Sequence, residues 1–108
     1  MKPTIKATNL TLTPAIKSYI EDKMAMVEKF LGTIDVINFD FEVELTTKHH
    51  NKGQIFRAEA NLEIAKDLLR VEKIETDLYK AIDKAKDHLI DLIKKHKEKR
   101  IAKRRQIE

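Results

Sequence analysis

Residues 39–45 read FDFEVEL and residues 56–64 read FRAEANLEI. In both stretches apolar side chains alternate with charged or polar ones, which is the period of two expected of a β-strand that buries one face. The polar members of the first stretch are all carboxylates, so its second face is anionic and is expected to stay in water. We therefore predict two long paired strands, joined by a polar loop at residues 47–53.

Two shorter strands are predicted beside this pair. Residues 2–8 alternate apolar with polar side chains, and residues 68–74 form an apolar-rich stretch after a turn at Lys66 and Asp67. The sheet is therefore expected to have four strands and to be mainly antiparallel.

A helix is predicted between the first two strands. Thr13 is a suitable N-cap, Pro14 suits the first helical position, and Gly32 is placed to end the helix. The apolar residues of this segment recur at helical spacing and form one stripe. They are Ile16, Tyr19, Ile20, Met24, Val27 and Leu31.

A second helix is predicted after the last strand. Thr76 is expected to cap it, with Asp77 beside the positive end of its dipole. Its apolar stripe comprises Leu78, Ile82, Ala85, Leu89, Leu92, Ile93 and His96. The same face then meets Arg100 and Lys103, which a buried stripe cannot accommodate. We therefore expect this helix to run past the sheet, into solvent or onto a partner.

These elements predict an α+β fold of order β-α-β-β-β-α. Two helices pack on one face of a four-stranded, mainly antiparallel sheet, and the other face is open to water. A chain of 108 residues is the size of one ordinary domain. We therefore expect a single domain over residues 1–108, with a basic helical extension at about 97–108.

The composition limits the chemistry. The chain has no cysteine, which excludes disulfides, zinc–thiolate sites and thiol nucleophiles and favours the reducing cytoplasm. No apolar run approaches the roughly 20 residues of a membrane span, and the first residues lack the apolar segment of a secretion signal. We expect a soluble cytoplasmic protein that does not contact a membrane.

Positive charge is concentrated at the end of the chain. Residues 92–108 carry eight of the 22 lysines and arginines but only two of the 18 carboxylates, so the other 91 residues carry 14 cations and 16 anions. The eight cations are Lys94, Lys95, Lys97, Lys99, Arg100, Lys103, Arg104 and Arg105. A run of charge is often only a solvated helix end, but one of such uniform sign favours contact with the phosphates of RNA.

Other candidate sites are weaker. His49 and His50 are adjacent on an extended segment and point to opposite faces, and His88 and His96 are eight residues apart, so neither pair suits a metal. Carboxylates on a solvated sheet have no cause to acquire the raised pKa of a catalytic acid, and no glycine-rich phosphate loop or serine elbow occurs. We expect neither an enzyme nor a cofactor. The sheet also shows no outward aromatic residue for stacking a base, so RNA should meet the helices and loop tips.

Three stretches resemble the ribosome hibernation-promoting factor and protein Y family. They are NLTLTPAI at residues 9–16, Tyr19-Ile20 with Lys23, and DLYKAID at residues 77–83 running on to His96-Lys97. The resemblance extends to about Arg100. It implies the fold predicted above, similar to a double-stranded-RNA-binding domain with an added strand. It also implies binding to the small ribosomal subunit and its RNA, in competition with mRNA and with A- and P-site tRNA, so that translation stops.

The resemblance also assigns residues. The family's basic positions on the last helix fall on Lys94, Lys95, Lys97, Lys99 and Arg100, and its basic loop-end positions fall on Lys52, Lys66 and Arg70. The segment 101–108 departs from the shortest family members, and its Lys103 and Arg104 join the expected RNA contacts. Compared with the long family members, the sequence lacks their C-terminal dimerisation domain, so we expect that the chain does not pair ribosomes through a second domain of its own. We also expect a monomer when the protein is free, with no small-molecule substrate.

Two alternatives remain open. A general double-stranded-RNA module would read A-form shape on many RNAs, although Asp77, Asp83 and Asp87 stand where such modules commonly present lysines. A protein-interaction module would instead use the basic helix to bind an acidic partner.

Overall fold

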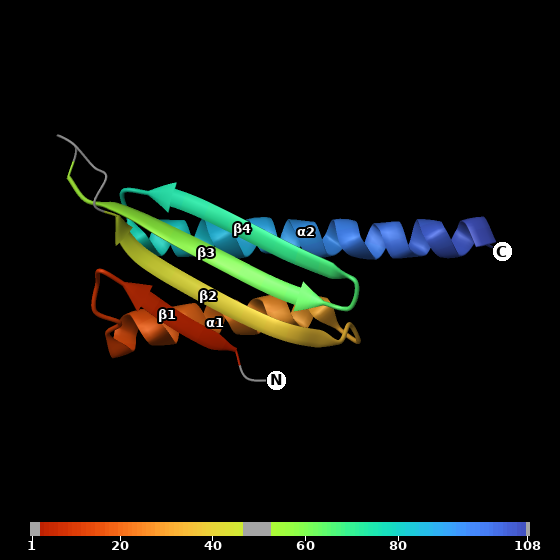
Figure 1. The fold of residues 1–108 in the computed structure, drawn as a ribbon, viewed down its shortest axis with the longest axis horizontal. Coiled ribbons are helices and arrows are strands. Elements are labelled where there is room, and N and C mark those ends of the chain that lie inside the picture. Colours follow the sequence, from red (N-terminus) through yellow and green to blue (C-terminus); the bar gives the residue numbers. More distant parts are fainter. Residues whose placement is uncertain (1–2, 47–52, 108) are drawn as a thin grey trace.

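The computed structural model describes residues 3–46 and 53–107 and contains four strands and two helices. The predicted α+β class and the order β-α-β-β-β-α are confirmed (Figure 1). The elements are β1 (Thr4–Thr8), α1 (Pro14–Leu31), β2 (Val36–Thr46), β3 (Ile55–Ile64), β4 (Asp67–Glu75) and α2 (Leu78–Ile107). The predicted loop contacts of Lys52, and the pair His49 and His50, lie outside the described residues.

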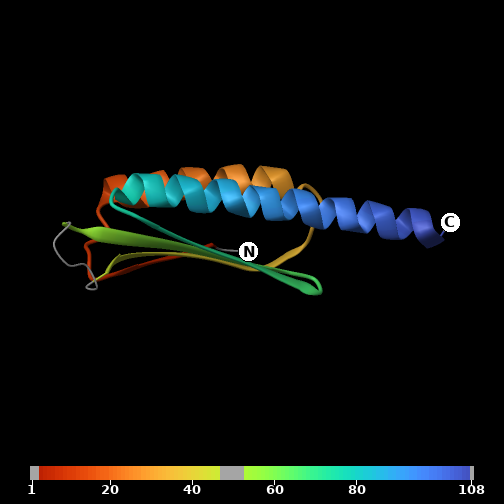
Figure 2. The same cartoon turned by 90° about the horizontal axis from the view of Figure 1, so that it is seen from above.

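The four strands form one sheet in the order β1-β2-β3-β4. Strand β1 is parallel to β2, because α1 crosses over between them, whereas β2, β3 and β4 pair antiparallel. Both helices lie on the same face of this sheet (Figure 2). The strand alternation therefore divides the side chains into an inner face toward the helices and an open face away from them.

The inner face matches the alternation in the sequence. Phe41 lies opposite Ala60, and Ala60 lies opposite Val71, so a large side chain on β2 is next to a small one on β3. The two alanines of β3, Ala58 and Ala60, are fully buried. Small residues in the middle of the sheet let α2 approach it closely, and large residues on either side fill the remaining space.

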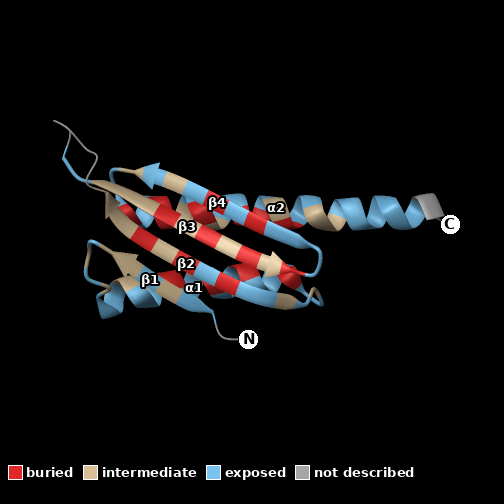
Figure 3. Cartoon of the chain, viewed as in Figure 1, coloured by how far each residue is buried: buried red, intermediate tan, exposed pale blue. Residues whose placement is uncertain are grey.

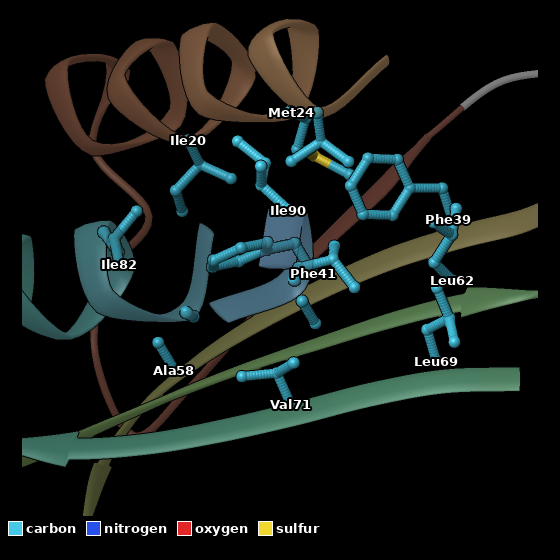
Figure 4. Close-up of a cluster of buried hydrophobic side chains, with 14 of the residues drawn as sticks. Ile20, Met24, Phe39, Phe41, Ala58, Leu62, Leu69, Val71, Ile82 and Ile90 are labelled. Carbon is cyan, nitrogen blue, oxygen red and sulfur yellow. The ribbon is translucent and has the colours of Figure 1, made fainter. Parts of the chain in front are cut away.

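One hydrophobic core occupies the space between the sheet and the helices (Figure 4). Its largest fully buried side chains are Phe39, Ile20, Leu62, Ile64, Ile82, Leu89, Ile93, Val27 and Val43. Helix α1 contributes four buried residues at helical spacing, Ile20, Met24, Val27 and Leu31. The predicted stripe of α1 is thus confirmed, except that Ile16 and Tyr19 at its beginning are only half-buried.

The first helix begins as predicted. Thr13 is the N-cap, and its Oγ1 accepts a hydrogen bond of 3.2 Å from the backbone N–H of Ile16. The prediction that Thr76 caps the second helix is wrong. Asp77 caps it instead, because its Oδ1 accepts hydrogen bonds from the backbone N–H groups of Tyr79 at 2.9 Å and Lys80 at 3.4 Å.

The buried stripe of α2 is wider than predicted. Ala81 and Ile90 are buried as well, and Leu92 is only half-buried. Helix α2 packs against β3, β4 and α1 together, so residues on two adjoining flanks of the helix lose contact with water. The sequence prediction took a single narrow stripe of apolar residues, as for a helix packed against one surface, so it did not include the residues on both flanks.

Helix α2 is 30 residues long and runs past the edge of the sheet, as expected (Figures 1 and 2). Ile93 is the last buried residue among those whose burial is described, and residues 94–105 are exposed or half-buried (Figure 3). The molecule measures 57 × 27 × 18 Å, and the projecting helix accounts for its length. No helix in residues 3–46 or 53–107 combines the length and apolarity needed to cross a bilayer.

Leu89 and Ile101 provide a matched test of this division of α2. Leu89→Ala should lower the free energy of unfolding by about 2 to 5 kcal/mol, because it opens a cavity at a fully buried site. Ile101→Ala, at a position 51% exposed beyond the core, should change it by no more than about 0.5 kcal/mol. Urea unfolding of the two variants measures both values, and equal losses would show that the projecting segment belongs to the core.

Candidate nucleic-acid interface

The candidate interface is residues 94–105 of α2, hereafter the basic segment. It contains eight lysines and arginines and one glutamate, Glu98. Every one of these cations is exposed except Lys97, which is half-buried. The segment begins where the core ends, at Ile93, so the helical backbone is held at one end and its cations face water.

Two cations of the basic segment are used within the protein. The Nζ of Lys97 donates a hydrogen bond to the backbone carbonyl oxygen of Phe30, in the last turn of α1. The Nζ of Lys94 lies 5.3 Å from the centroid of the Phe30 ring. A cation at the C-terminal end of a helix is favourable because the carbonyls there carry partial negative charge. Lys97 therefore helps to hold α1 against α2 as well as contributing charge.

The other six cations have no internal partner in the part of the chain that the structure describes. Among the described residues, none forms a hydrogen bond or an ion pair with the side chains of Lys95, Lys99, Arg100, Lys103, Arg104 and Arg105. Within residues 3–46 and 53–107, the charge of these six groups is not used internally.

Lys66 lies close to the basic segment although it is far away in sequence. It sits in the turn between β3 and β4 with a φ of 67°, and it lines a hollow of about 510 Å³ together with Lys99, Arg100 and Lys103. His96 ties this turn to α2, because its Nδ1 is 3.0 Å from Asp67 Oδ2. The structure thus brings Lys66 together with the cations of the helix.

A second hollow, of about 770 Å³, lies on the other flank of the basic segment. It is bounded by the end of α1 at Leu31 and Gly32 and by Lys97, Arg100 and Arg104 of α2. The two hollows share Thr33, Ile34, Arg100 and Lys103. Cations therefore surround the point at which α2 leaves the body of the protein.

Arg70 is not brought to this surface. It lies on the open face of β4, where its Nε donates a hydrogen bond of 2.6 Å to Asn61 Oδ1. The connection that holds Lys52 lies outside the described residues, and the strand ends it joins, Thr46 and Ile55, are at the opposite end of the sheet from Lys66. Of the nine predicted contact residues that the structure describes, Arg70 therefore lies apart from the surface formed by Lys66 and the cations of α2.

Arg57 organises the open face of the sheet. Its guanidinium contacts four carboxylates, at 2.7 Å from Glu44, 2.8 Å from Glu42, 3.0 Å from Glu59 and 3.3 Å from Glu72. Glu42 and Glu59 lie directly opposite each other on β2 and β3, and Glu59 lies opposite Glu72 on β4. Like charges in that register repel, so Arg57 is required to hold the row together.

The pKa values reflect this arrangement. The hydrogen bond from Thr8 Oγ1, at 2.7 Å, and then the bonds from Arg57 hold the pKa of Glu42 below its usual 4.5, although partial burial opposes them. Hydrogen bonds to Glu44 and then Glu42 raise the pKa of Arg57. The sequence predicted an anionic, solvated face; the described face carries six carboxylates against Lys6, Arg57 and Arg70, so it is anionic, but its centre is an ion-paired network.

The candidate interface shows no arrangement for metal binding. In the part of the chain that the structure describes, histidines and carboxylates do not gather in groups of three or more that could hold a metal ion. What it offers a ligand is positive charge on a rigid helix.

Comparison with known proteins identifies the family. The family model described as "Sigma 54 modulation protein / S30EA ribosomal protein" matches residues 4–101, most of the chain. The chain belongs to this family. The family resemblance identified from the sequence motifs is thereby confirmed.

Relatives within the S30EA family carry a functional name. The chain is 30% identical over 99 residues to the ribosome hibernation promotion factor of Bacillus subtilis (strain 168), covering 92% of this chain and 50% of that protein. It is 32% identical over 93 residues to the protein of the same name from Staphylococcus aureus (strain COL), covering 86% and 46%. The chain spans about half the length of these curated relatives.

Solved structures agree with the fold. The N-terminal domain of Thermus thermophilus Protein Y superposes with a TM-score of 0.72 at 30% identity, covering 86% of this chain and 94% of that one. A ribosomal subunit interface protein from Coxiella burnetii superposes with a TM-score of 0.65, covering 88% and 98%. The second pair is only 17% identical and shows the fold alone.

The residues that carry the S30EA resemblance join the two helices. Tyr19 of α1 donates its hydroxyl to both carboxylate oxygens of Asp83, at 2.7 and 2.9 Å, and Lys23 lies 3.2 Å from the same carboxylate. The ring of Tyr79 meets that of Tyr19 edge-on, with centroids 4.7 Å apart. The bond to Asp83 and then burial raise the pKa of Tyr19 to about 12. These side chains fix how the helices pack, a role that the motif did not reveal from sequence alone.

The ion-paired open face predicts how stability depends on pH. Because the folded pKa of Glu42 is below 4.5, the stability it contributes is present above pH 4.5 and is lost as the pH falls through the lowered value. Arg57→Met leaves facing carboxylates unneutralised and should cost about 1 to 3 kcal/mol at pH 7. The difference from the unmodified protein should be smaller at pH 3 than at pH 7, because lowering the pH toward and through the lowered pKa of Glu42 removes negative charge that Arg57 neutralises.

Unfolding by urea at the two pH values measures this change. Arg70→Met is the matched control, since Arg70 is on the same face but bonds to an uncharged amide oxygen; its effect should be smaller and nearly independent of pH. An Arg57→Met penalty that is the same at pH 7 and pH 3 would contradict the electrostatic role of Arg57.

Proposed function

We propose that the chain is a ribosome hibernation factor that binds the small ribosomal subunit through phosphates of ribosomal RNA. It inhibits translation by occupying the space that mRNA and the A- and P-site tRNAs use. No reaction is catalysed, and inhibition is stoichiometric. The observation that carries the proposal is the basic segment, held on a rigid helix beyond the core, in a chain whose S30EA relatives are named ribosome hibernation promotion factors.

Electrostatics supports RNA as the ligand. A helix rises 1.5 Å per residue, so the basic segment presents its cations over roughly 17 Å, enough to meet several phosphates in succession. The helix is already ordered and anchored by Ile93 and Lys97, so binding does not have to order it. Phosphate contacts of this kind provide affinity and orientation without reading the base sequence.

The charge distribution supports one orientation on the ribosome. The proposed contacts cluster on α2 and the β3–β4 turn, while the open face of the sheet carries an excess of carboxylates. The proposed contacts in this cluster are Lys66, Lys94, Lys95, Lys97, Lys99, Arg100, Lys103 and Arg104. The helix side then faces RNA, and the acidic open face meets whatever else enters the groove and repels an incoming nucleic acid. Arg70 faces away from this cluster, on the open side of the sheet. Lys52 lies outside the described residues and stays a predicted contact.

A general double-stranded-RNA module is less well supported. At the start of α2, Asp77 is used as the helix cap and Asp83 binds Tyr19, so this end presents carboxylates rather than cations. Binding to a short RNA duplex as tight as binding to intact small subunits would favour that alternative.

Salt dependence tests the electrostatic mechanism. Lys99→Gln/Lys103→Gln should weaken binding to small subunits and reduce the slope of log affinity against log salt concentration by roughly 1.5 to 2, because each phosphate contact releases condensed counterions. Stability should not change, since neither side chain has an internal partner among the described residues.

Lys80→Gln/Lys84→Gln is the control for this experiment. It removes the same charge at the same spacing on the same helix, but at positions next to Glu75, 4.0 and 3.0 Å away. Its salt slope should stay close to that of the unmodified protein. Equal effects of the two double variants would mean that net charge, and not the basic segment, drives binding.

Competition tests the occlusion mechanism. The protein should bind small subunits carrying mRNA and initiator tRNA much more weakly than empty ones, because the three ligands fill the same space. In a purified translation system, synthesis should fall in proportion to the fraction of ribosomes bound. A single subunit that holds mRNA, tRNA and the protein together with undiminished affinity would refute occlusion.

A further inference from the structure

Phe30 is an exposed aromatic ring at the edge of the basic segment. It lies in the last turn of α1 with 39% of its surface exposed. Lys94 lies over its ring, and Lys97 is bonded to its carbonyl oxygen. Helix α1 ends alongside α2 shortly before α2 continues alone (Figures 1 and 2). A partly exposed apolar ring thus lies beside two of the cations proposed to bind phosphates.

We propose that Phe30 is a stacking platform for an unpaired nucleobase of the RNA that the basic segment binds. This inference rests on the proposed function and adds to it a residue that distinguishes unpaired from paired RNA. Unpaired bases stack on aromatic side chains, and their phosphates bind nearby cations. Phe30 of α1 provides the aromatic ring, and Lys94 and Lys97 of α2, which both contact Phe30, provide the cations.

Lys94 does not prevent stacking on the ring. An exposed cation–π contact is weaker than the stacking of a base on an aromatic ring. A base can therefore replace the Lys94 ammonium over Phe30, and the freed ammonium can reach a phosphate of the same strand. After this exchange the Phe30 ring contacts the base, and the Lys94 ammonium is paired with a phosphate.

Lys97 connects Phe30 to a hollow that can hold a nucleotide. The hollow of about 770 Å³ is lined by Leu31, Lys97 and Arg104 among others, though not by Phe30 itself, and Lys97 is also bonded to the Phe30 carbonyl oxygen. A nucleotide whose base stacks on Phe30 can thus place its sugar and phosphate toward the cations of α2.

The other aromatic candidates are less suitable. In the described part of the chain, the other exposed aromatic residue is Tyr79, 40% exposed. Its ring is engaged edge-on by Tyr19, and the adjoining carboxylate of Asp83 would repel a phosphate. The open sheet face presents no aromatic side chain within the described strands.

A tryptophan probe reports stacking directly. The chain contains no tryptophan, so Phe30→Trp introduces a single indole at the proposed platform. Titration with purified bacterial small ribosomal subunits should quench its fluorescence, because a stacked base quenches the indole. Met26→Trp is the matched control, one turn earlier on α1 and 41% exposed, and it should be quenched much less. Equal quenching of both probes, no quenching, or a blue shift without quenching, which indicates contact with protein, would overturn the proposal.

Affinity for small subunits provides the second readout. Phe30→Ala should weaken binding about 5- to 100-fold without changing the salt slope, because no charge is removed. Phe30→Tyr should bind like the unmodified protein. Phe30→Leu keeps an apolar side chain that packs on α1 but cannot stack, and it should bind as weakly as the alanine variant.

The outcomes separate this inference from the proposed function. If the unmodified protein binds subunits and Phe30→Leu binds equally well, stacking is wrong and the phosphate-binding role stands. If the unmodified protein does not bind subunits at all, both proposals fail. Urea unfolding of each variant confirms that a loss of affinity is not a loss of fold.

Discussion

The apolar face of α2 is the constraint on which the rest of the structure depends. From Leu78 to Ile93 this face is buried against the sheet and α1 at once, and it holds the two layers together. Beyond Ile93 the helix has no apolar face to bury, but helical hydrogen bonding continues from the anchored part. The first part of α2 therefore stabilises the fold, and the part that follows presents the cations of the basic segment. Because both belong to one helix, the core fixes the direction in which the cations project.

Charge is separated by the thickness of the fold. The projecting end of α2 carries cations that have no internal partner among the described residues, and the open face of the sheet carries carboxylates that Arg57 holds together. Each set is stabilised locally, the first by exposure to water and the second by ion pairing, so neither depends on the other for folding. The charge of the domain is therefore distributed asymmetrically, which suits a polyanionic ligand that contacts only the basic surface.

The contact between the end of α1 and α2 links helix packing to the basic segment. Lys97 reaches the carbonyl of Phe30, and Lys94 covers its ring, so the first turn of the basic segment also secures the end of α1. At the other end of the pair, Tyr19 and Asp83 close the same interface. Tyr19, Asp83 and Lys97, which belong to the segments that carry the family resemblance, therefore help to fix how the two helices pack, and the basic segment begins next to this interface.

The sequence by itself determined the elements, their order and the point at which α2 leaves the core, because period and polarity are local properties of the chain. It also located the basic segment, since a run of like charge needs no neighbours to be seen. Only the tertiary structure decided which distant groups meet. Lys66 lies beside the basic segment because the β3–β4 turn lies next to α2. Arg70 is on the open face, so the sheet separates it from α2. Arg57 faces four carboxylates because of the strand register. Register and packing depend on contacts between residues far apart in the chain, which alternation and spacing do not encode.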